Sequence, residues 1–229
     1  MLEYAGSQSR GVTRRRDEGA TLTGVDVGPE ARGLVPTPEW RQHHFRYAID
    51  KLWKPGNSIQ LAIGQGDLLV TPLQMARFYA LIANGGKLVT PHVLFDVEDP
   101  NGQVLPTKAL ASPMQINVDP AGLQAIRAGL YAATHAPLGT SYGVFGGFQV
   151  PVAGKTGTAE KVVTLPGYTG IQNQSWWCGY GPFEDPKLVV CAVIENGGHG
   201  GTAAAPAALK VFEQYFHVKA GQQGIIHSD

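Results

Sequence analysis

An unbroken run of seven apolar residues, Leu188 to Ile194, limits the fold of this chain more than any other feature. Such a run predicts a β-strand covered on both faces, because neither set of alternating side chains suits contact with water. Helices must supply that cover, and three segments carry helical signals: residues 72–84, 120–136 and 202–216. The sequence therefore predicts a three-layer α/β arrangement.

Two more strands are expected before the apolar run, at Gln149–Glu160 and Ser175–Gly181. A turn-rich segment, residues 182–186, separates the second of these from the run, so those two strands should form a hairpin. The side chains of Trp176 and Trp177 should then point to opposite faces of the sheet and pack in the core. The helix from Pro72 is apolar nearly all round, which predicts burial on most sides.

Composition narrows the choice of partners and cofactors. The chain has 229 residues with 18 Lys plus Arg and 18 Asp plus Glu, and this neutral balance predicts no nucleic-acid partner. Apolar stretches are too short to span a bilayer, so the chain reads as soluble.

Cys178 and Cys191 could face each other across the hairpin, but two buried small apolar side chains are the favoured interpretation. His43-His44 lacks a third ligand at metal spacing, so no metal or cofactor is expected.

The cluster Lys155-Thr156-Gly157-Thr158 carries the chemistry of the chain. On a strand, Lys155 and Gly157 would point to one face and the two threonines to the other, and strand twist near a sheet edge would let cation and hydroxyl approach one point. Such donors suit a carboxylate, and Gly157 leaves room for another backbone alongside. This pattern favours a peptide that ends in a carboxylate and pairs with the strand edge.

Two alternatives come from different classes of protein. One is a non-catalytic binding module for peptide carboxylates. The other is an esterase, because Gly139-Thr140-Ser141-Tyr142-Gly143 matches the G-x-S-x-G nucleophile elbow. That elbow requires a strand before it and a helix after it. Here a predicted helix precedes the segment, so a glycine-rich loop is the favoured interpretation of residues 139–143. Around His199, which lies among four glycines, a tight strand-to-helix turn is the favoured interpretation.

The Lys155-Thr156-Gly157 triplet and six further segments resemble the transpeptidase domain of penicillin-binding proteins. The similarity is greatest to the cell-elongation type, penicillin-binding protein 2. It runs from about Thr23 to Phe216 in the order found in that family. The segments are Gly33–Trp40, Trp53–Ser58, Ala62–Gly66, Leu69–Ala76, Ala83–Gly86, Val152–Glu160 and Glu195–Gly201.

The resemblance implies a peptidoglycan D,D-transpeptidase with an antiparallel sheet between helical layers. Its serine would attack the D-Ala-D-Ala bond of a stem peptide, and β-lactams would acylate the same serine. Lys155, Thr156 and Thr158 would bind the terminal carboxylate or tune proton transfer, and Gly157 would admit the substrate strand. The backbone N–H of Thr158 would be one oxyanion-hole donor.

The chain departs from the family pattern in its serines. None of its seven serines has lysine three places on, or asparagine or aspartate two places on, so the S-x-x-K and S-x-N motifs are absent. We therefore expect an atypical segment at 1–22, the C-terminal portion of a transpeptidase domain at 23–217, and a polar tail at 218–229. This portion should be inactive alone, with an incomplete sheet that leaves residues 188–194 at an open edge.

The resemblance also implies partners and a location for the full-length protein. Stem peptides and β-lactams would be its ligands, and membrane-embedded cell-elongation proteins its partners. It would act on the extracytoplasmic face of the cytoplasmic membrane, although this sequence shows no anchor.

Overall fold

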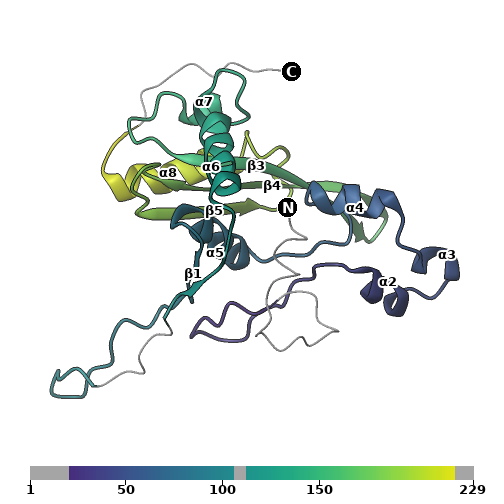
Figure 1. The fold of residues 1–229 in the computed structure, drawn as a ribbon, viewed down its shortest axis with the longest axis horizontal. Helices are drawn as coiled ribbons and strands as arrows, with labels where there is room; N and C mark the ends of the chain where they lie inside the picture. Colours follow the sequence, from purple (N-terminus) through teal and green to yellow (C-terminus); the bar gives the residue numbers. More distant parts are fainter. Residues whose placement is uncertain (1–20, 106–111, 220–229) are drawn as a thin grey trace. The chain divides into compact units, whose positions relative to one another are not determined.

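The apolar run Leu188–Ile194 is strand β5 of an antiparallel sheet, with the bounds that the sequence predicts (Figure 1). The computed structural model describes residues 21–105 and 112–219. These residues form two units: one holds residues 21–22 and 29–71, and the other holds residues 23–28 and those from 72 onward. Most of the 1–22 segment and of the 218–229 tail lies outside the described residues.

The unit at 29–71 consists of three short helices and their connections. They are α2 (Pro38–His44), α3 (Ala48–Lys51) and α4 (Pro55–Ala62). The hydroxyl of Thr37 caps α2 by accepting the N–H of Trp40 over 3.0 Å. An ion pair of 2.8 Å between Arg41 and Asp67 joins α2 to the segment after α4. None of these three helices contains a buried residue.

The second unit is built on a three-stranded sheet in the order β3-β4-β5. Strand β3 spans Ala153–Leu165 and β4 spans Tyr168–Gly181. Both hairpins are antiparallel, which confirms the hairpin between β4 and β5. The first hairpin is longer than predicted: β3 runs past Glu160, and β4 begins before Ser175. Gly167 supplies the positive φ, 77°, that the connecting turn requires.

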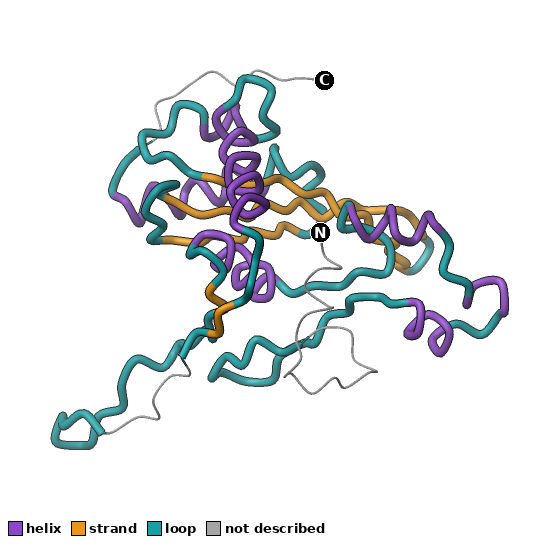
Figure 2. The backbone as a smooth tube through the Cα atoms, in the orientation of Figure 1, coloured by secondary structure: helices purple, strands orange, loops and turns teal. Residues whose placement is uncertain are grey.

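Helices α5 (Pro72–Ala83), α6 (Pro120–His135) and α8 (Ala204–Phe216) correspond to the three predicted helices. A side-chain cap starts α6, where Asp119 accepts the N–H of Gly122 over 2.7 Å. The short helix α7 (Tyr142–Phe145) was not predicted. Strands β1 (Lys87–Leu88) and β2 (Met114–Gln115) pair with each other. The segment after β1 is mostly loop (Figure 2). It carries exposed apolar side chains, including Phe95.

Alternating side chains of β4 face two separate cores, which confirms the three-layer prediction. Trp177 is fully buried on the face covered by α7 and α8, while Trp176 and Tyr180 face α5 and α6. The first core contains Phe145, Phe148, Val152, Trp177, Val190, Ala204, Ala205, Ala208, Leu209 and Phe212. The second contains Tyr79, Ile82, Ala83, Ala153, Cys178 and Tyr180.

Two predictions about burial were wrong. Cys178 and Cys191 are not separate apolar side chains: they are direct partners in the β4–β5 register and form a disulfide. The sequence places the two cysteines on facing strands of a hairpin, but it does not fix the register, which decides whether they pair. Helix α5 buries only Tyr79, Ile82 and Ala83 among its residues, whereas burial on most sides was expected.

The open edge of β5 agrees with the expectation. Within the described part of the chain, β5 pairs with β4 and with no second neighbour. In the same part of the chain, no helix has the length and hydropathy needed to cross a membrane.

Candidate carboxylate site

The Lys155–Thr158 cluster lies on β3, at the edge of the sheet. Its cross-strand partners on β4 are residues 175–178, and in the described chain β3 has no strand on its other side. Backbone groups along an unpaired strand edge are available to an added extended peptide. The predicted edge position of the cluster is therefore present.

The ammonium group of Lys155 turns back onto its neighbour. Its Nζ atom lies 2.9 Å from the Thr156 carbonyl oxygen and 3.1 Å from Thr156 Oγ1. Thr156 Oγ1 in turn donates to Thr140 Oγ1 over 2.9 Å. Cation and hydroxyl thus approach one point although their side chains leave the strand on opposite faces, as the sequence predicts.

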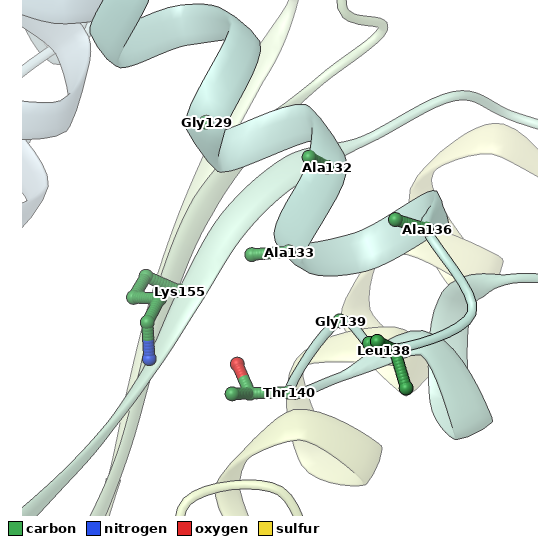
Figure 3. Close-up of a pocket in the computed structure, with 8 residues that line it drawn as sticks. All are labelled: Gly129, Ala132, Ala133, Ala136, Leu138, Gly139, Thr140 and Lys155. Atoms are coloured by element: carbon green, nitrogen blue, oxygen red, sulfur yellow. The ribbon is translucent and has the colours of Figure 1, made fainter.

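A pocket of about 290 Å³ opens beside this group. Lys155 lies on one side of it and Thr140 on another, while α6 forms a third wall (Figure 3). Apart from Lys155, every residue lining the pocket is uncharged: Gly129, Ala132, Ala133, Ala136, Leu138, Gly139 and Thr140. Partial desolvation lowers the pKa of the Lys155 ammonium group below 10.5. An anion entering the pocket would therefore meet one cation with no competing charge from the lining.

Helix α6 is fixed to the start of β3 by a buried hydroxyl. Thr134 is fully buried, and its Oγ1 atom lies 2.7 Å from the carbonyl oxygen of Val152, the residue before β3. This contact joins the helix that walls the pocket to the strand that carries Lys155. Sequence reasoning missed both Thr134 and Thr140, because each contacts a segment distant in sequence.

The loop between β5 and α8 supports the other end of the cluster. Gly200 N–H donates to Thr158 Oγ1 over 3.4 Å. The carbonyl of His199 accepts from Ser175 Oγ over 2.9 Å and from the N–H of Thr202 over 3.1 Å. These bonds confirm the tight turn predicted around His199. The role of the Thr158 backbone N–H as an oxyanion-hole donor stays a prediction.

Ser141 has a structural position that does not suit a nucleophile. It is 2% exposed, and its hydroxyl donates to the Ala133 carbonyl and accepts from Trp177 Nε1. Helix α6 precedes it, where an esterase elbow requires a strand. The esterase interpretation therefore has no support in the structure. Within the described residues, no group of three His, Cys, Asp or Glu side chains is arranged to hold a metal ion.

Comparison with known proteins points to the same family as the sequence motifs. A family model described as "Penicillin binding protein transpeptidase domain" matches residues 19–213. The chain is 34% identical over 212 residues to the peptidoglycan D,D-transpeptidase MrdA of Haemophilus influenzae. It is 30% identical over 210 residues to the MrdA protein of Acinetobacter baumannii.

Solved structures of penicillin-binding protein 2 share the fold. The enzyme from Pseudomonas aeruginosa, solved in complex with WCK 5153, matches with a TM-score of 0.64 and 28% identity over 84% of this chain and 39% of its own. The protein from Helicobacter pylori, solved in complex with MreC, matches with a TM-score of 0.66 and 29% identity over 87% of this chain and 34% of its own.

The similarity covers most of this chain but a smaller part of its relatives. The match to the H. influenzae protein includes 87% of this chain and 31% of the relative, so the chain spans about a third of that protein's length. The match to the A. baumannii protein includes 84% and 29%. With a family model matched over residues 19–213, the chain belongs to the penicillin-binding protein transpeptidase domain family.

Proposed function

We propose that this chain forms the carboxylate-binding side of a peptidoglycan D,D-transpeptidase site. The observation that carries the proposal is Lys155, a cation at the mouth of a pocket whose other lining residues are uncharged, on an edge strand able to pair with a peptide. The names of its relatives support the substrate class, since the MrdA proteins are peptidoglycan D,D-transpeptidases.

In this proposal each group of the cluster has a separate task. The stem peptide lies along β3, and Gly157 leaves room for its backbone. Lys155 and the hydroxyl of Thr158 hold the terminal carboxylate through charge-assisted hydrogen bonds, each contributing about 1.5–3 kcal/mol. The Thr156 hydroxyl donates to Thr140 and accepts from the Lys155 ammonium group, which it helps to orient. The Thr158 N–H donates to the carbonyl oxygen of the D-Ala-D-Ala bond as negative charge develops on it.

The reaction also needs a nucleophile. A serine hydroxyl must add to that carbonyl and lose its proton to a base, so that the amide bond breaks and an acyl-enzyme forms. The S-x-x-K motif that supplies serine and base in this family does not occur in this sequence. We therefore assign to this chain peptide binding and transition-state stabilisation, and we expect no acylation by the chain alone.

Binding can be measured by calorimetry with the peptide diacetyl-Lys-D-Ala-D-Ala. Lys155→Met should weaken binding roughly 10- to 150-fold, the equivalent of one lost charge-assisted hydrogen bond. Lys161→Met is the matched control, because Lys161 lies further along β3 and pairs with Glu195 on the surface. The proposal fails if the two variants weaken binding equally, or if a peptide amidated at its C-terminus binds as well as the free acid.

A second candidate function, a non-catalytic module for peptide carboxylates, is favoured by the missing S-x-x-K motif. Fluorescent penicillin separates the chemistry from the binding. The chain should bind the peptide yet show no covalent penicillin band after denaturing electrophoresis. A covalent band would reveal a nucleophile in this chain and overturn our assignment.

We further propose that the full-length protein acts on the extracytoplasmic face of the membrane with cell-elongation partners. The Cys178–Cys191 disulfide supports an oxidising compartment. The H. pylori relative was solved in complex with MreC. Cysteine labelling of intact cells with a membrane-impermeant reagent, at a cysteine introduced at an exposed position such as Leu138, would test the location.

A further inference from the structure

Three polar groups connect β3 to the loop between α6 and α7. Lys155 Nζ lies 3.1 Å from Thr156 Oγ1, and Thr156 Oγ1 donates to Thr140 Oγ1 over 2.9 Å. A hydroxyl has a single proton. Because Thr156 gives its proton to Thr140, its oxygen lone pairs remain for the ammonium group of Lys155.

Thr140 is held in place by both of its neighbours. Gly139 packs so closely on the end of α6 that a Cβ atom there would lie 2.6 Å from the carbonyl oxygens of Ala132 and Ala133. On the other side, Ser141 N–H donates to the Ala133 carbonyl over 3.0 Å, and Ser141 Oγ accepts from the buried Trp177. The Thr140 backbone therefore has little freedom, which limits the positions from which its hydroxyl can accept from β3.

We propose that Thr140 is a positioning residue that fixes the Thr156 hydroxyl and, through it, the Lys155 ammonium group in the orientation that receives a ligand carboxylate. This inference rests on the proposed function, and it adds a residue from outside the Lys-Thr-Gly-Thr segment. Thr140 acts through Thr156.

The physical reason is the flexibility of the groups involved. An exposed lysine side chain loses rotamer entropy when it is immobilised on a ligand, and a threonine side chain has more than one accessible rotamer. A hydrogen bond to an acceptor on a constrained backbone favours one orientation of Thr156 before the ligand arrives. Part of the side-chain entropy that would be lost on binding is then already lost in the free protein.

The link can be measured in the full chain without any ligand. Thr140→Val removes the hydroxyl at nearly constant shape, and Thr140→Ser keeps it. Titration of the Lys155 side chain by NMR should show its pKa lowered further in the Val variant, because Thr156 no longer presents its lone pairs to the ammonium group. Among the described residues Lys155 has no acidic ion-pair partner, and the pocket lining is otherwise uncharged, so few other groups can mask the shift.

Binding of diacetyl-Lys-D-Ala-D-Ala supplies the second readout. Thr140→Val should weaken binding roughly two- to ten-fold, as expected for one neutral hydrogen bond, and Thr140→Ser should restore it. Thr156→Val removes the direct acceptor of the ammonium group and sets the largest Lys155 shift to expect. Thr140→Ala also removes the Thr140 hydroxyl, and it serves as the decisive variant if Thr140→Val does not fold.

Each outcome decides the proposal. An unchanged Lys155 titration in Thr140→Val overturns it, as does a Thr140→Ser variant that behaves like Thr140→Val. If the wild-type chain fails to bind the peptide while the titration still shifts and the Ser variant restores it, the proposed function is wrong but Thr140 still orients the pair. If the wild type binds and Thr140→Val binds equally well, the positioning role is wrong and the proposed function stands.

Discussion

Gly200 shows how one missing side chain lets the β5–α8 loop reach the binding strand. A Cβ atom at Gly200 would collide with the carbonyl oxygens of Trp176 and Gly157 and lie 2.9 Å from the Gly157 nitrogen. These are backbone atoms of β3 and β4, so they cannot move aside cheaply. Glycine at this position therefore brings the loop onto the strands that carry the carboxylate site, where Gly200 N–H also reaches Thr158 Oγ1.

We expect Gly200→Ala to lower the free energy of unfolding by about 1–3 kcal/mol, as overpacking does in other well-packed sites. Urea denaturation followed by tryptophan fluorescence measures this change. Gly143→Ala is the control: a Cβ atom added there would meet nothing within 4 Å, and alanine is the better helix former in α7. The contact at Gly200 would be unimportant if both variants unfolded at the same urea concentration.

At the scale of the elements, the disulfide joins β4, whose side chains enter both cores, to the edge strand β5. Cys178 and Cys191 are separated by 13 residues, and Cys178 is also the direct cross-strand partner of Lys155. The cross-link therefore lies in the same row across the sheet as the binding cation. Closing a loop of this size removes conformational freedom from the unfolded chain, which is worth about 3 kcal/mol in the loop-entropy model.

Reduction should therefore lower the free energy of unfolding by roughly 2–4 kcal/mol. Urea unfolding with and without dithiothreitol measures the difference, with mass spectrometry to establish the thiol state. The Cys178→Ala/Cys191→Ala double variant is the control, because its unfolding should not respond to dithiothreitol. Equal unfolding midpoints for the oxidised and reduced wild type would contradict the expectation.

The elements differ in how far their sequences predict them. Strand β5 was predicted with its observed bounds, since a seven-residue apolar run fits no other role in a chain with helices on both sides. The outer half of the β3–β4 hairpin was missed, because none of the side chains whose burial the structure describes there is buried, so burial imposes no alternation on its sequence. Val162 and Ile171 are partners there, yet they are 71% and 64% exposed. Backbone pairing and the turn at Gly167 define this ribbon.

The residues of the candidate site also differ in how far the sequence predicts their role. Lys155 to Thr158 could be identified from residue type and spacing, since donors for a carboxylate are adjacent in sequence. Thr140 could not, because its bond to Thr156 spans 16 residues and follows from how α6 and Trp177 fix the loop. Contacts that depend on tertiary packing leave no local pattern.

At the scale of the whole molecule, the two units differ in how much they bury. The second unit holds both hydrophobic cores. In the described part of the first unit, residues 29–71, Pro36 is the single residue classed as buried. Several of its large apolar side chains are exposed instead, among them Ile59 at 63% and Ile63 at 66%. Helices as short as α4 are marginal in water without tertiary packing.

This contrast predicts two levels of local stability within the chain. Amide hydrogens of β4 from Ser175 to Gly181, where it has a strand on each side, should exchange slowly and approach the global unfolding limit, because opening them disrupts both cores. Those of α2, α3 and α4 should exchange faster by several orders of magnitude, since their opening exposes little new apolar surface. Hydrogen exchange followed by mass spectrometry on peptides from 38–62 and 175–181 gives both rates in one experiment. Comparable protection of the two peptides would mean that residues 29–71 are stabilised by burial that the helices themselves do not provide, and the carboxylate site would then have to be understood as part of a larger cooperative unit.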